Sequence, residues 1–299
     1  MNFLRDFDPR HGCAIRVAPL VERVTAPNAG LFSFHGTNTY LVGEESVCVI
    51  DPGPDDPMHL QALIDALRGR MVTHIAITHT HVDHSPLSAK LKAATGAQTV
   101  GAGRHHAARP LFAGEVNHFA ESADMLFVPD IQVGHGDRIS GDRWSLSAVP
   151  TPGHCANHLA YALEGTGILF SGDHVMAWST SIVAPPDGSM AQYMASLDTL
   201  LHRGDQIYFP GHGGPVLEPA AFVRDLKAHR IERERAILER LKAGDRKIAA
   251  IVAAIYRDVD PRLHGAAAFS VLAHVEDLLQ RGEIVAEGPP SLDADYRLG

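Results

Sequence analysis

The chain has 299 residues, of which 45% are hydrophobic, and this length is enough to bury a core larger than that of one small domain. No run of eighteen apolar residues occurs, and acidic residues interrupt the N-terminal MNFLRDFDPRHG segment where a signal peptide would have its apolar core. These features argue against a membrane protein and predict a soluble, cytoplasmic one.

The formal net charge of −9 is unevenly distributed. Residues 1–220 hold 13 Lys and Arg against 22 Asp and Glu, whereas residues 221–299 hold 13 of each. An acidic first part argues against avid nucleic-acid binding, although bound divalent metals would offset some of that charge. The three cysteines, Cys13, Cys48 and Cys155, are odd in number and widely separated, so they do not form a disulfide framework.

The first hundred residues alternate between short strands and helices. Proline in the first turn and leucines at helical spacing predict a helix over residues 57–67, and a second helix is expected over 86–94 before Gly96. Strand patterns cover residues 17–24, 47–50, 74–77 and 98–100. This alternation indicates a layered α/β protein.

A cluster of metal-capable side chains follows the third of these strands. The segment THTHVDHS places His79, His81, Asp83 and His84 within six residues. In an extended or turning segment, positions i and i+2 point the same way, so the first two histidines face one ion while Asp83 and His84 turn towards a second. The segment therefore predicts half of a two-metal site.

Three later segments provide the other half. His154 lies in TPGH, Asp173 in SGDH and His212 in PGHG, and each follows a strand pattern that stops at Pro or Gly. Those strand patterns cover residues 144–149, 167–170 and 206–209, and a further strand is expected over 158–163. The repeated strand-then-ligand context supports a real metal site.

With these residues in this order, the chain resembles the metallo-β-lactamase superfamily, whose hydrolases carry HxHxDH followed by a His, a bridging Asp and a last His. The resemblance implies a four-layer αββα sandwich. It also implies one metal held by His79, His81 and His154, a second held by Asp83, His84 and His212, and Asp173 bridging both. Zinc suits such an imidazole-rich site, and the carboxylates also admit iron or manganese. Asp51, in VIDPGP, corresponds to a residue that supports the metal loop.

Two loops near these ligands are candidates for the substrate pocket. Residues 101–133 give no clear periodicity, and either a substrate-access insertion or helices over the sheet edge would fit them. The segment after Asp173 must line the pocket as it leaves the metal bridge, and it enters a helix near Met190. It provides the candidate substrate contacts Trp178, Ser179, Thr180 and Tyr193. For each residue alone, packing against the sheet is the competing interpretation. Asp83 and His174 are the candidate catalytic groups, to orient the nucleophile and to donate a proton.

The composition changes after the last ligand. A long amphipathic helix over 219–243, helices over 248–256 and 266–280, and a strand at 283–285 suggest a winged-helix-like module. We therefore divide the chain into a catalytic domain, residues 1–220, and a helical C-terminal module, residues 221–299. Residues 224–247 hold nine basic and five acidic residues, which suits either a solvated helix face or contact with nucleic acid. The module is also a candidate for homodimer contacts.

The chain also resembles one branch of the superfamily, the lactamase-beta-2-like branch. The resemblance lies in the segments APNAGLFSFHGTNTYLVG, THTHVDHSP and HRIERERAIL and in the C-terminal helices. Several functions follow from this resemblance. The first is a binuclear hydrolase that uses a metal-bridging hydroxide on a small ester, thioester or lactone, and the acidic catalytic part favours it. The second is an endoribonuclease acting on single-stranded RNA, as one mitochondrial member of the branch is regarded. A mononuclear iron oxidoreductase of the persulfide dioxygenase type is a third, and a non-enzymatic scaffold is disfavoured because every ligand is present. Asp173 argues against a genuine β-lactamase.

Overall fold

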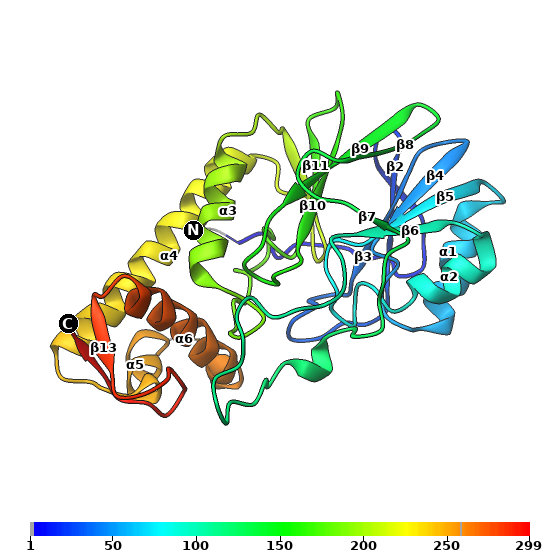
Figure 1. The fold of residues 1–299 in the computed structure, drawn as a ribbon. Helices are drawn as coiled ribbons and strands as arrows, with labels where there is room; N and C mark the ends of the chain where they lie inside the picture. Colours follow the sequence, from blue (N-terminus) through cyan, green and yellow to red (C-terminus); the bar gives the residue numbers. More distant parts are fainter. Residues whose placement is uncertain (1–2, 258) are drawn as a thin grey trace.

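Two β-sheets lie face to face at the centre of the catalytic part (Figure 1). The computed structural model describes residues 3–257 and 259–299. The first sheet has the order β1-β2-β3-β4-β5-β6-β7, with strands Ile15–Ala18, Val21–Thr25, Asn38–Val42, Ser46–Ile50, Met71–Ala76, Gln98–Gly101 and Ile131–Gln132. The second has the order β12-β11-β10-β9-β8, with β8 to β12 at Arg138–Gly141, Trp144–Pro150, Leu159–Leu163, Ile168–Gly172 and Ile207–Pro210.

Helices cover the outer face of each sheet. Helices α1 (Pro57–Leu67) and α2 (Ser88–Thr95) pack on the first sheet, and α3 (Met190–Leu201) and α4 (Pro219–Lys242) pack on the second. Apolar side chains from both sheets, among them Tyr161 and Phe170, form the layer between them. The expected αββα sandwich is therefore confirmed. Strands β2, β3, β4, β10 and β11 are buried along their whole length, because each lies between two layers.

The first helix shows how closely local sequence specifies an element. Asp56 caps it, because its carboxylate accepts hydrogen bonds from the backbone N–H groups of Met58 (2.7 Å) and His59 (3.0 Å). Pro57 occupies the first turn, where its missing N–H is not needed, and Arg68 ends the helix in a left-handed conformation. The predicted bounds, 57–67, are those observed.

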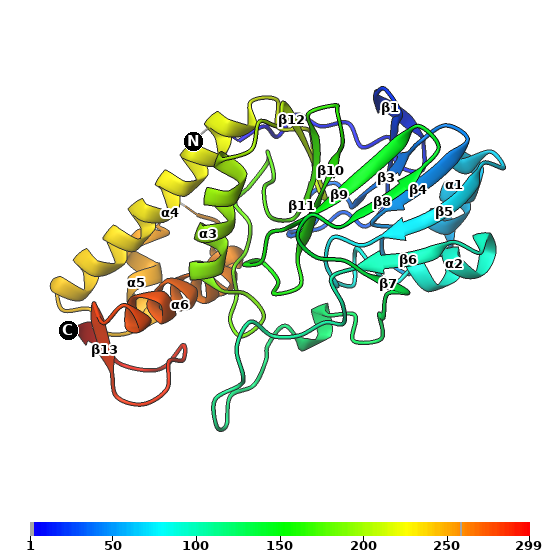
Figure 2. The same cartoon turned by 45° about the horizontal axis from the view of Figure 1, so that its top comes forward.

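The C-terminal module has a separate core. Its helices α5 (Ile248–Ile255) and α6 (His264–Gln280) pack with the end of α4, and β13 (Ile284–Ala286) pairs antiparallel with β14 (Tyr296–Leu298). Figure 2 shows α4 running from the sandwich to this module. Within residues 3–257 and 259–299, two 3₁₀ turns complete the elements, at Ala120–Ser122 and Pro261–Leu263. Across the described ranges, none of the helices is both long and apolar enough to cross a membrane.

The segment between β6 and β7 is largely irregular. It contains the 3₁₀ turn Ala120–Ser122 and none of the α-helices that were one of the two expectations for residues 101–133, all of which the structure describes. Arg109 in this segment pairs with Glu276 of α6, and the Phe119 and Phe269 rings lie 4.9 Å apart. The segment therefore connects the catalytic part to the C-terminal module.

Candidate metal centre

The ends of four strands bring the candidate ligands together. Strands β4, β5 and β6 run parallel, as do β11 and β12, so their carboxyl ends open at shared edges. The turns after β5, β9, β11 and β12 supply all seven predicted ligands: His79, His81, Asp83, His84, His154, Asp173 and His212. Each of the seven belongs to at least one group whose ligand atoms lie within 4.8 Å of one another.

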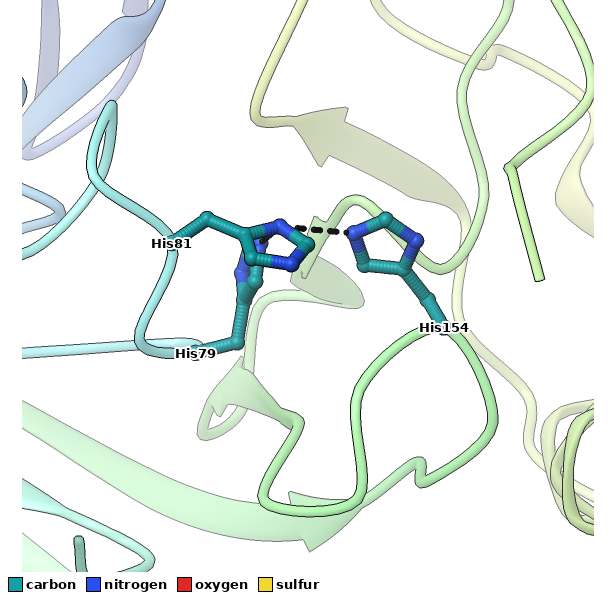
Figure 3. A group of neighbouring side chains, drawn as sticks. All are labelled: His79, His81 and His154. Atoms are coloured by element: carbon teal, nitrogen blue, oxygen red, sulfur yellow. Dashed lines mark hydrogen bonds between the residues drawn. The ribbon is translucent and has the colours of Figure 1, made fainter. Parts of the chain in front are cut away.

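The first group consists of three histidines (Figure 3). Nδ1 of His81 lies 2.9 Å from Nε2 of His79 and 3.1 Å from Nε2 of His154. Burial lowers the pKa of all three side chains, that of His81 to about 3. The rings are therefore neutral at pH 7, which is the form that binds a metal ion.

The second group combines a carboxylate with two histidines. Nε2 of His212 lies 3.3 Å from Oδ2 of Asp83, and Nε2 of His84 lies 3.7 Å from the same oxygen. Asp173 faces both groups, since its Oδ2 lies 3.3 Å from Nε2 of His212 and 3.9 Å from Nε2 of His154. Asp173 therefore lies between the two groups.

Two observations show that these residues fit divalent ions. Nε2 of His84 and Oδ1 of Asp173 are buried and have no hydrogen-bond partner among the described residues, an arrangement that costs free energy unless a ligand pairs with them. Burial would also lower the pKa of His212 and His84, but the Asp173 and Asp83 carboxylates raise it, to about 10 for His212. The carboxylates thus attract positive charge to the place where cations would bind.

Asp51 contacts the loop of residues 78–84 that carries four of the ligands, as expected from the sequence. Its carboxylate accepts hydrogen bonds from the backbone N–H of Thr78 (2.7 Å) and from the Thr78 hydroxyl (2.7 Å). Nδ1 of His84 lies 3.0 Å from the same carboxylate. A hydrogen bond to Nδ1 leaves Nε2 free to bind a metal ion.

Other orienting groups are backbone carbonyls, which the sequence could not reveal. Nδ1 of His154 lies 2.6 Å from the carbonyl of Ile182, and Nδ1 of His212 lies 3.2 Å from the carbonyl of Gly36. Every residue type has a carbonyl, so no side-chain signal marks these positions.

Comparison with known families agrees with this geometry. Residues 33–212 match the metallo-beta-lactamase superfamily. The chain belongs to this superfamily. Residues 248–289 match the beta-lactamase associated winged helix domain. The protein is therefore a hydrolase of the superfamily with a C-terminal winged-helix module.

Relatives and solved structures match along most of the chain. The chain is 30% identical over 286 residues to a beta-lactamase-like protein 2 homolog from Drosophila melanogaster, covering 90% of this chain and 91% of the relative. It is 26% identical over 258 residues to an atrochrysone carboxyl ACP thioesterase from Aspergillus chevalieri, covering 84% and 75%. A beta-lactamase domain protein from Burkholderia ambifaria has a similar fold, with a TM-score of 0.80, 22% identity and coverage of 98% and 96%.

The predicted proton donor, His174, is as buried as the most buried ligands of the site. His174 is fully buried, and its ring lies 4.5 Å from that of Tyr193, outside the three ligand groups. Burial, together with His154 and Arg230, lowers its pKa to about 3, so the ring is neutral at pH 7. Its catalytic role stays a prediction, as does that of Asp83, whose side chain is 29% exposed.

The candidate substrate contacts divide into packed and accessible residues. Tyr193 is fully buried, and its hydroxyl donates to the carbonyl of His174 (2.9 Å). Trp178 stacks on Phe34, with ring centroids 4.7 Å apart, while Ser179 and Thr180 are half-buried. Contact with substrate stays a prediction for all four, and the burial of Tyr193 supports the competing interpretation of packing.

Proposed function

We propose that the protein is a binuclear metal-dependent hydrolase that acts on a small thioester. The observation that carries the proposal is the arrangement of three overlapping ligand groups, in which His79, His84 and Asp173 connect the other two. In this proposal Asp173 would bridge two ions, which would separate this site from one that holds a single ion. We assign it to the catalytic domain, residues 1–220, followed by the module of residues 221–299.

The protein's residues would hold the two ions and shape the site around them. His79, His81 and His154 would hold one, Asp83, His84 and His212 the other, and Asp173 both; bound there, two divalent ions supply an activated water nucleophile at neutral pH and polarise the substrate carbonyl. Zinc suits the nitrogen-rich set, and iron or manganese is the alternative. Asp83, the partly exposed carboxylate, would orient the nucleophile and accept a proton.

The thioester is favoured among small substrates because two relatives from Aspergillus species are named atrochrysone carboxyl ACP thioesterases. Esters and lactones share the attack at a carbonyl carbon and come next. Some of the α4 cations have partners within the chain, which weakens the case for RNA. Lys227 pairs with Asp198, Arg240 pairs with Asp245, and Arg233 donates to the carbonyl of Ile255 (2.9 Å).

The test is turnover of a panel of acyl thioesters of N-acetylcysteamine by zinc-loaded protein, followed by release of the free thiol. Matched ester and lactone substrates run beside them, with the Asp83→Ala variant as the control for contaminating activity. We expect thioester cleavage by the wild type and a loss of at least about 100-fold in the variant.

Two results would contradict the proposal. Cleavage of a labelled single-stranded RNA by the wild type but not by Asp83→Ala, without thioester turnover, would make the protein an endoribonuclease. One bound iron per chain together with oxygen consumption on a persulfide substrate would make it a mononuclear oxidoreductase. A homodimer through the C-terminal module stays a separate prediction, tested by mass in solution.

A further inference from the structure

A buried arginine of α4 reaches the loop behind the metal centre. Arg230 is 2% exposed, and its Nη2 donates a hydrogen bond to the carbonyl of Ser181. Arg230 lies beyond residues 33–212, the part that matches the superfamily, and before the winged-helix match. A guanidinium is costly to bury unless its donors are used, so this contact calls for an explanation.

The carbonyl that Arg230 contacts belongs to a residue connected to the metal bridge. The Ser181 hydroxyl lies within hydrogen-bond distance of two backbone carbonyls, those of Asp173 (2.5 Å) and His174 (2.8 Å). Ser181 is itself 1% exposed, so water does not compete for these bonds. Ser181 therefore connects Arg230, which bonds to its carbonyl, with the main chain of Asp173, which bonds to its hydroxyl.

The next residue in the loop orients a ligand of the other group. The carbonyl of Ile182 lies 2.6 Å from Nδ1 of His154, so it accepts the Nδ1–H of a neutral imidazole. That bond leaves the lone pair on Nε2, which faces Nδ1 of His81 at 3.1 Å. Arg230 therefore bonds to the carbonyl of Ser181, and the adjacent carbonyl, that of Ile182, orients the ring of His154.

Helix α3 supports the same loops from another side. A Cβ added to Gly153 would lie 2.4 Å from Cα of Tyr193, and the Gly153 carbonyl accepts from the backbone N–H of Ser189 (2.9 Å). The guanidinium of Arg230 lies 5.1 Å from the centroid of the Tyr193 ring. The chain before His154 is thus pressed against α3, and Arg230 reaches across from α4 to hold the loop that His154 bonds to.

We propose that Arg230 is a positioning residue of the metal centre. By donating to the carbonyl of Ser181 it fixes the Ser181–Ile182 segment, which in turn aims Nε2 of His154 at the first metal and restrains the backbone of Asp173. The proposal rests on the metal centre of the proposed function. It makes α4 part of that centre, although α4 supplies no ligand.

The test measures metal affinity and uses a second arginine of the same helix as its control. Arg230→Met keeps the length of the side chain and removes its donors, and Arg230→Lys restores a donor. Arg233→Met removes a guanidinium that donates to the carbonyl of Ile255, away from the metal loops. Zinc affinity is measured by competition with a chelator, and the Co²⁺ absorption spectrum reports the geometry of each site.

We expect Arg230→Met to weaken binding of the ion held by His79, His81 and His154 by about 10- to 100-fold. This is the usual effect of losing a group that orients a ligand. Arg230→Lys should recover part of that loss, and Arg233→Met should bind zinc like the wild type. In metal-free, histidine-labelled protein, nuclear magnetic resonance should show less of the Nδ1–H form of His154 in Arg230→Met. This last readout requires no metal.

The outcomes separate the two proposals. A wild type that binds no divalent ion overturns the metal centre and this inference with it. A wild type that binds two ions, with Arg230→Met equal to it in affinity and in His154 tautomer, overturns the role of Arg230 alone. Equal loss of affinity in Arg230→Met and Arg233→Met also overturns it, because the effect would then come from general destabilisation of α4.

Discussion

The carboxylate of Asp173 faces ligand nitrogens of both metal groups, at 3.3 Å from His212 and 3.9 Å from His154. Asp173→Ala should therefore remove bound metal and activity together, with at least about 100-fold lower turnover, because two cations lose the charge between them. Metal content by mass spectrometry and thioester turnover are the measurements. Normal metal content in this variant would contradict the assignment of Asp173 as the bridge.

The effect of Asp173→Ala on metal binding can be compared with that of a substitution at His158. It is buried, its Nε2 accepts the backbone N–H of Asp173 (3.1 Å), and its Nδ1 lies 2.8 Å from the Thr151 hydroxyl. Because it touches the main chain of Asp173 and lies in none of the ligand groups, His158→Ala should weaken metal binding less than Asp173→Ala.

Protons should leave two histidines when metal binds. Burial opposes the protonated forms, but the neighbouring carboxylates raise the pKa of His84 well above its usual value and that of His212 to about 10. Both rings therefore carry an extra proton, and a positive charge, at pH 6.5 in metal-free protein, and both must lose it to bind metal. We expect release of about two protons per chain at pH 6.5, and zinc affinity that rises with pH up to about 10, the pKa of His212. Calorimetry of zinc binding in buffers of different ionisation enthalpy measures this number, and uptake or no release would contradict it.

The turn after β12 lies against two of the metal ligands. Gly211 follows β12, and a Cβ added there would lie 2.4 Å from Oδ1 of Asp173 and 2.7 Å from Cε1 of His84. Gly211→Ala should therefore displace two ligands and weaken zinc binding by at least about 10-fold. Gly204→Ala is the control, because nothing lies within 4 Å of its added Cβ. Equal zinc affinity in both variants would show that the metal centre tolerates a methyl group at this turn.

Elements with a strong local signal were predictable, and those that depend on distant contacts were not. The bounds of α1 follow from Asp56, Pro57 and helical spacing, and the ligand turns follow buried strands. In contrast, β14 has three residues and is fixed by pairing with β13, which no local pattern marks. The path of residues 101–133 depends on contacts with α6, more than a hundred residues away, so its short-range pattern was uninformative.

The same limit applies to the groups that orient the ligands. His81 and His154 were identifiable by type and spacing, whereas the carbonyls of Gly36 and Ile182 carry no signature. Arg230 belongs to the basic segment 224–247, where a solvated helix face or a nucleic-acid contact was the natural interpretation. Its burial follows from the packing of α4, which composition does not specify.

At the scale of the whole molecule, one arginine connects the irregular segment to the C-terminal module. Arg109 lies within 2.7 Å of Glu115 and 2.5 Å of Glu276, and its side chain is 18% exposed. The same segment contacts the metal loop, because the backbone N–H of Val82 donates to the carbonyl of Ser122 (2.9 Å). The winged-helix module can thus hold in place a loop that borders the metal ligands.

Arg109→Leu should release that loop, because it leaves two carboxylates without their shared cation. We expect a loss of about 1 to 3 kcal/mol in the free energy of unfolding, less than for a fully buried pair, and a higher KM with a smaller change in kcat. Burial raises the pKa of Glu276, and Arg109 partly offsets this. Without the arginine the pKa rises further, so Glu276 is more easily protonated, and the stability loss should be smaller at pH 5 than at pH 8. Chemical denaturation at the two pH values measures it, with Arg262→Leu, which removes an exposed ion pair with Asp260, as the control. A variant as stable as this control at pH 8, with unchanged KM, would show that the module does not hold the loop.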